Sequence, residues 1–122
     1  MSTQITAPTA PDMGVQQRIS YMTALSLAEM IISESTVMPA SFVIEVVEHR
    51  PTKPAIRFYF HQDPAAVREF ADERWMDVTA ETRDDGSVYT EARGGLCRGV
   101  LVTAWTLMPA EAIVAVADEV AA

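Results

Sequence analysis

The pattern of hydrophobic and polar positions divides residues 12–122 into helices and strands. The helices are expected at 13–33, at 64–74 and from 109 onward, and the strands at 41–50, 55–61, 75–83, 87–93 and 97–107. On the last strand Leu101, Trp105 and Leu107 alternate with Val100, Val102 and Ala104. A strand at a sheet edge, or with one face in water, alternates apolar with polar residues instead. The pattern therefore predicts a central strand that is covered on both faces.

The helix over 13–33, for which Asp12 is the expected N-cap, is apolar around most of its circumference. One set of apolar residues follows helical spacing, namely Val15, Ile19, Met22, Leu25, Ala28 and Ile32. Leu27, Met30 and Ile31 add to this set. Such a helix is either enclosed by the core or has a partner outside its own domain. Enclosure is the simpler interpretation. The alternative predicts a homodimer with Leu27, Met30 and Ile31 at its interface, which Leu27→Glu or Ile31→Glu would weaken without unfolding the chain.

The prolines between the first two strands cannot continue a ladder, so these strands are expected to pair as a hairpin. Matching their apolar faces allows two registers, in which Val46 lies opposite Phe58 or opposite Phe60. The second register also sets Glu45 opposite His61. In that register Glu45 and His61 form either an acid–base pair for catalysis or an ordinary cross-strand salt bridge, and the sequence does not distinguish the two.

The segment 63–93 carries consistent local signals. Asp63 and Pro64 are typical of the N-cap and the first position of a helix. The turn 84–86 has glycine where a three-residue hairpin loop needs a left-handed residue. The register that follows pairs Thr82 with Val88, Ala80 with Thr90, Val78 with Ala92, and Asp77 with Arg93.

Gly94-Gly95 is the expected turn of the last hairpin, because both residues of a two-residue type I′ turn need positive φ. This turn would pair Arg93 with Leu96 and Glu91 with Arg98. The final helix would present one apolar stripe, consisting of Ile113, Val116, Ala117 and Val120.

Together these elements predict an α+β fold in the order α-β-β-α-β-β-β-α. We expect a five-stranded antiparallel sheet in the order 2-1-5-4-3, with the helices packed on it, in a single domain over 12–122. Residues 1–11, with two prolines, are expected to form a flexible tail. The strand order resembles that of PAS, GAF, profilin-like and roadblock-type domains. This resemblance is one of topology alone and implies no function.

Composition narrows the class of partner. The net charge of −8 argues against direct binding to nucleic acid or to an anionic membrane. No apolar run approaches the length of a membrane span, and the N-terminus does not resemble a secretory signal. The single cysteine, Cys97, excludes an internal disulfide and is consistent with the reducing cytoplasm.

Catalytic motifs are absent from the sequence, and neither a cofactor nor a metal is predicted. Glu45 and His49 lie four residues apart on a strand, about 13 Å, so one zinc ion cannot bind both. The candidate small-ligand site is a pocket between sheet and helices, lined by Tyr59, His61 and Trp105 with Glu45 nearby.

Three functions are consistent with these features. The first is a small acidic cytoplasmic protein that acts as an adaptor or regulatory accessory through protein–protein contacts, as a homodimer. The second is a ligand-binding or enzymatic domain that uses the pocket at Tyr59, His61 and Trp105. The third is a phage-type DNA mimic, suggested by the acidic residues Asp77, Glu81, Asp84, Asp85 and Glu91. Interspersed arginines favour an ordinary solvated face over the mimic.

Overall fold

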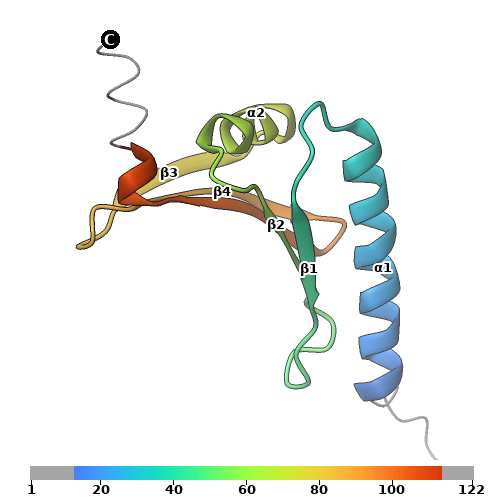
Figure 1. Ribbon diagram of the computed structural model, residues 1–122. Helices are drawn as coiled ribbons and strands as arrows, with labels where there is room; N and C mark the ends of the chain where they lie inside the picture. Colours follow the sequence, from blue (N-terminus) through green and yellow to red (C-terminus); the bar gives the residue numbers. More distant parts are fainter. Residues whose placement is uncertain (1–12, 114–122) are drawn as a thin grey trace, which may run out of the picture.

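The computed structural model describes residues 13–113 and confirms the α+β class. Its elements are α1 (Met13–Glu34), β1 (Ser41–Glu45), β2 (Ala55–Tyr59), α2 (Pro64–Arg74), β3 (Asp77–Thr82), β4 (Val88–Cys97) and β5 (Val100–Met108) (Figure 1). Residues 110–113 begin a further helix. The predicted tail, the Asp12 cap and the stripe residues Val116, Ala117 and Val120 lie outside the described residues.

The five strands form one mixed sheet in the order β1-β2-β5-β4-β3. The central position of β5 is confirmed. The predicted order 2-1-5-4-3 is wrong for the first hairpin, because β2 and not β1 lies beside β5, and the two run parallel. In β2 the side chains of Ile56 and Phe58 are fully buried, whereas most of β1 is exposed at the sheet edge. The more completely buried strand of the hairpin, β2, therefore lies inside the sheet. Because the strand order differs from the predicted one, the topological resemblance to PAS-like domains no longer applies.

The β1–β2 hairpin keeps the predicted match of apolar faces but in a different register. Phe42 lies opposite Phe58, and Glu45 lies opposite Ala55. Both predicted registers of Val46 are wrong because β1 ends at Glu45. The chain then forms two successive turns, in which Arg50 N–H donates to the Val47 carbonyl and Lys53 N–H to the Arg50 carbonyl. Residues 46–50, which were predicted to belong to the strand, therefore lie outside the ladder.

The segment 63–93 follows its prediction closely. Asp63 caps α2 by accepting a hydrogen bond from the Ala66 N–H at 3.0 Å, and Pro64 is the first helical residue. All of the pairs predicted between β3 and β4 are present. Gly86 has the left-handed conformation, with φ at 86°. Here local turn chemistry and side-chain alternation require the same register.

The turn of the last hairpin is not at Gly94-Gly95. Arg98 and Gly99 form it, with φ values of 53° and 79°, and Gly94-Gly95 lies within β4 where the register shifts. At Gly94 a Cβ atom would lie 3.1 Å from Cγ of Met76, so a larger residue would be crowded there. Glu91 consequently lies opposite Trp105 rather than opposite Arg98.

The hydrophobic core lies between one face of the sheet and both helices. Phe58 of β2 contacts Phe70 of α2, with ring centroids 5.2 Å apart. From α1 the core receives Ala24, Leu27, Ala28 and Ile31, and from α2 it receives Ala66, Val67, Phe70 and Ala71. Figure 1 shows both helices on the outer side of the curved sheet.

The opposite face of the sheet has no helix over it within residues 13–113 (Figure 1). On β5, Val100 and Val102 are buried under the helices, whereas Leu101 is 39% exposed. The prediction that β5 is covered on both faces is therefore correct for one face only. Among the described residues no helix combines the length and apolar character needed to cross a bilayer.

Candidate functional site

Three of the four predicted ligand-binding residues come together on the open face of the sheet. Tyr59 and Trp105 are neighbours in the β2–β5 register, with ring centroids 4.7 Å apart. Tyr59 Oη and His61 Nδ1 share a hydrogen bond of 2.8 Å. Glu45 does not join them, because it pairs with Ala55 at the far end of the hairpin. The predicted pairing of Glu45 with His61 is therefore wrong, and no acid–base pair forms there.

Tyr89 of β4 extends this group across the sheet. Its ring stacks beside Trp105 at a centroid distance of 5.9 Å. The Arg57 guanidinium lies 5.3 Å from the Trp105 ring centroid and donates a hydrogen bond of 3.2 Å to the Tyr89 hydroxyl. The Arg83 guanidinium lies 5.0 Å from the Tyr89 ring centroid. We call Arg57, Tyr59, Arg83, Tyr89 and Trp105 the ring cluster.

Hydrogen bonds link Tyr89 of the cluster to neighbouring charged side chains. The Tyr89 hydroxyl donates to Glu91 at 2.8 Å, and Arg93 donates to the same carboxylate at 2.6 Å. Burial, followed by the neighbouring Glu91, raises the pKa of Tyr89 above its ordinary value. Burial also acts to raise the pKa of Glu91, but the hydrogen bonds from Tyr89 and Arg93 outweigh it, so that the Glu91 pKa lies below its ordinary value. The Tyr89 hydroxyl therefore has both a donor, Arg57, and an acceptor, Glu91, within the sheet face.

The lowered pKa of Glu91 predicts an acid-sensitive contribution to stability. Because the donors bind the ionised carboxylate, the folded-state pKa lies below the unfolded value, which is about 4.5. The contribution is complete above that value and is lost as the pH falls through the folded-state pKa. We expect the free energy of unfolding to fall less steeply with decreasing pH in Glu91→Gln than in the wild type. Urea denaturation at several pH values between about 6 and about 3 measures both slopes, and equal slopes would contradict the assignment.

The ring cluster lies on a surface rather than in a pocket. None of the five hollows described in residues 13–113 is lined by Tyr59, His61 or Trp105. The predicted pocket between sheet and helices is therefore not found at these residues. Their side chains project from the face opposite the helices, because Tyr59 and Trp105 alternate with the core residues Phe58 and Ala104.

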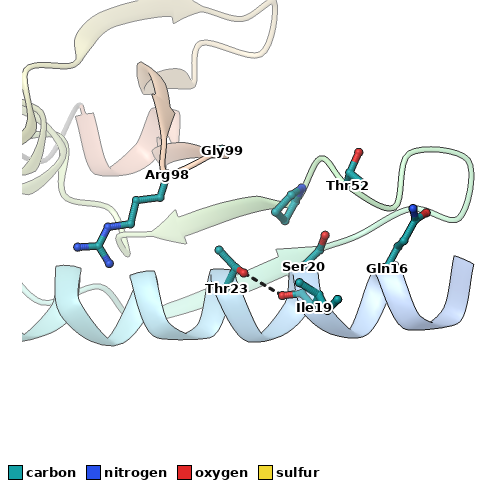
Figure 2. A pocket seen from close by; sticks show the side chains of 8 residues that line it. Gln16, Ile19, Ser20, Thr23, Thr52, Arg98 and Gly99 are labelled. Carbon is teal, nitrogen blue, oxygen red and sulfur yellow. Dashed lines mark hydrogen bonds between the residues drawn. The ribbon is translucent and has the colours of Figure 1, made fainter. Parts of the chain in front are cut away.

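A hollow of about 260 Å³ lies beside α1 instead, as Figure 2 shows. Gln16, Ile19, Ser20, Thr23, Thr52, Pro54, Arg98 and Gly99 line it. The hydroxyls of Ser20 and Thr23 already donate to the carbonyls of Pro51 and Ile19. The lining includes no carboxylate, histidine or cysteine, so it offers no acid–base pair. Within the described part of the chain, no group of three or more potential metal ligands gathers anywhere.

The residues predicted for a dimer interface lie on the inner side of α1. Leu27 and Ile31 are 0% and 1% exposed and belong to the core, and Met30 packs against its rim. Arg98 donates a hydrogen bond to the Met30 sulfur at 3.4 Å. Leu27 and Ile31 are therefore not available to a second chain, and any contact through α1 must use its other side.

The comparisons with known proteins add no function, because no protein-family model, no curated protein and no solved structure matches this chain. Sequence reasoning identified Tyr59 and Trp105 but missed Arg57, Tyr89 and Arg83. The sequence signal for Arg57 and Tyr89 is that polar and aromatic residues occupy every second position of their strands, at 57 and 59 and at 89, 91 and 93. That signal can be interpreted only once β2 is known to lie beside β5.

Proposed function

We propose that this protein is a protein-binding accessory that recognises its partner through the ring cluster. The proposal rests on one observation, which is that tryptophan, tyrosine and arginine side chains gather on a sheet face that no helix covers in residues 13–113. These three residue types contribute a disproportionate share of the energy in protein interfaces. They also lie on a rigid sheet, so little side-chain entropy remains to be lost on binding.

None of the five hollows described above is lined by Tyr59, His61 or Trp105, which favours a protein partner over a small molecule. Small-ligand sites are concave and enclose most of the ligand, whereas the ring cluster is spread over β2, β5 and β4, with Arg83 just after the end of β3. A surface of this kind suits a second protein surface, with Trp105 at its centre and polar groups such as His61 and Glu91 around it.

The charges of the cluster indicate the chemistry of the partner. Within residues 13–113, neither Arg57 nor Arg83 lies within 4 Å of a carboxylate oxygen, and both guanidiniums rest on aromatic rings. They can therefore receive one or two carboxylates from a partner. Asp77 and Glu81 lie on the same face. These two carboxylates and the net charge of −8 repel the continuous phosphates of a nucleic acid more strongly than one or two isolated carboxylates of a partner. The lone Cys97 supports a cytoplasmic location for this role.

Affinity capture from the native host followed by calorimetry with the purified partner tests the proposal. We expect Trp105→Ser to raise the dissociation constant by about 30-fold or more, because removing a central tryptophan from an interface typically costs at least about 2 kcal/mol of binding free energy. Arg57→Met, which keeps the aliphatic stem and removes the charge, is expected to weaken binding less. Thermal denaturation of each variant checks that the fold is retained.

Trp75→Ser is the matched control, because this indole is 94% exposed at the end of α2 and is not part of the cluster. It should leave the partner affinity unchanged. Equal affinities of wild type and Trp105→Ser would refute the proposal. Titration with a single-stranded oligonucleotide, followed by tryptophan fluorescence, tests the other ligand class that aromatic platforms accept. Oligonucleotide binding that Trp105→Ser abolishes, with no captured protein, would also refute it.

A further inference from the structure

The outer side of α1 carries an exposed stripe whose two ends have opposite charge. Arg18, Met22, Leu25 and Glu29 follow one another at intervals of four, three and four residues, which places them on one side of a helix. All four are exposed, and Met22 and Leu25 are 62% and 47% exposed. The stripe is opposite the buried residues Ala24, Leu27, Ala28 and Ile31. A helix that is apolar on two opposite sides has one more apolar side than its own core requires.

The charges at the two ends of the stripe have no ion-pair partner in the described part of the chain. The ion pairs found in residues 13–113 are Arg74 with Glu34 and Arg93 with Glu91, so that neither Arg18 nor Glu29 takes part in one. The stripe therefore reads positive, apolar, apolar, negative from its start to its end. When two copies of the stripe lie antiparallel, each positive end faces a negative end, and the apolar residues face each other.

We infer that the outer side of α1 binds α1 of a second copy of this chain, with the two helices antiparallel. A twofold axis that crosses the helix between positions 23 and 24 sets Arg18 of each copy opposite Glu29 of the other. The same axis sets Met22 of each copy against Leu25 of the other. A parallel arrangement would set Arg18 against Arg18, so the charges select the antiparallel one. Ile19 and Tyr21, which are 59% and 41% exposed, flank the stripe and extend the contact.

This dimer does not depend on the proposed function. The helices lie on the core side of the sheet (Figure 1), whereas Tyr59 and Trp105 alternate with core residues and lie on the open side. The helix contact therefore leaves both ring clusters free. A dimer of this form presents two partner-binding faces. A bivalent partner would then bind with an effective affinity higher than that of one face alone.

Complementary charge variants of the full chain test the pairing. We expect the wild type to be a dimer at about 50 μM by light scattering coupled to size exclusion. Arg18→Glu sets two carboxylates against each other at both ends of the contact, and Glu29→Arg does the same with two cations. Each variant alone should raise the dimer dissociation constant by about tenfold or more.

Mixing the two variants identifies the partner residues. In a heterodimer of Arg18→Glu with Glu29→Arg, each charge again faces an opposite one, so dimers should reappear in the equimolar mixture. The double variant Arg18→Glu/Glu29→Arg should dimerise with itself for the same reason. Arg68→Glu, on the exposed side of α2, changes the net charge by the same amount as Arg18→Glu and should leave the dimer intact. A monomeric wild type at about 50 μM, single variants that dimerise normally, or a mixture that stays monomeric would each overturn the inference.

Discussion

Leu27→Glu is expected to leave the chain largely unfolded at about 25 °C. The Leu27 side chain is 0% exposed and packs in the core beneath α1. The substitution removes the packing of a buried leucine, which costs about 2–5 kcal/mol, and places a carboxyl group among apolar side chains, which adds to that cost. The sum is comparable with the whole stability of a typical domain, about 5–15 kcal/mol. Far-UV circular dichroism and urea denaturation measure the effect.

Ser26→Glu is the control for this result, because it introduces the same side chain one residue earlier at an exposed position of α1. It should remain folded. A folded Leu27→Glu would show that α1 is not packed as described. The sequence-based expectation that Leu27→Glu weakens a dimer without unfolding the chain is wrong, because Leu27 is buried in the core of its own chain.

Phe58→Ala is expected to lower the free energy of unfolding by about 3–5 kcal/mol. Phe58 is fully buried, and its ring contacts Phe42 at 5.7 Å and Phe70 at 5.2 Å between centroids. It therefore connects the edge strand β1 to α2 across the core. Truncation would leave a cavity whose walls come from three different elements, which limits how far they can collapse into it.

Urea denaturation with a linear extrapolation measures this loss. Phe42→Ala offers the comparison, because Phe42 touches the same ring from an edge strand and is 37% exposed. Its loss should be less than half as large as that of Phe58. Equal losses for the two variants would place the centre of the core nearer β1 than the structure does.

The two proposed surfaces use opposite sides of the molecule for a physical reason. A single sheet has two faces, and here both described helices pack on the same one. The other face remains open to carry Arg57, Tyr59 and Trp105 in addition to Tyr89. The outer side of α1 is open for a different reason, which is that only one side of a helix can contact the sheet.

Local chemistry was sufficient wherever a signal and its consequence lie close together in the sequence. The cap of α2 at Asp63 and Pro64 was predicted correctly, because capping involves only the residues within one turn. The β3–β4 register was also predicted correctly, because Gly86 and the alternation on both strands demand the same pairing. The apolar run in β5 predicted its central position, since only a strand with neighbours on both sides can bury so many residues.

Other features depended on choices between local alternatives of similar energy. Two glycine-containing turns were available to the last hairpin, and the packing of Gly94 near Met76 accompanies the use of Arg98-Gly99. Both strands of the first hairpin have an apolar face, so the sequence pattern did not determine which of them lies beside β5.

Sequence pattern alone was enough to predict the α+β class, the order of the helices and strands, the β3–β4 hairpin and the central place of β5. The tertiary structure decided which side of α1 enters the core, which strand pairs with β5, and hence that Tyr59, Trp105 and Tyr89 meet on one face. Periodicity reports how apolar each side of an element is. It does not report which other element covers that side, because covering depends on contacts between residues far apart in the chain.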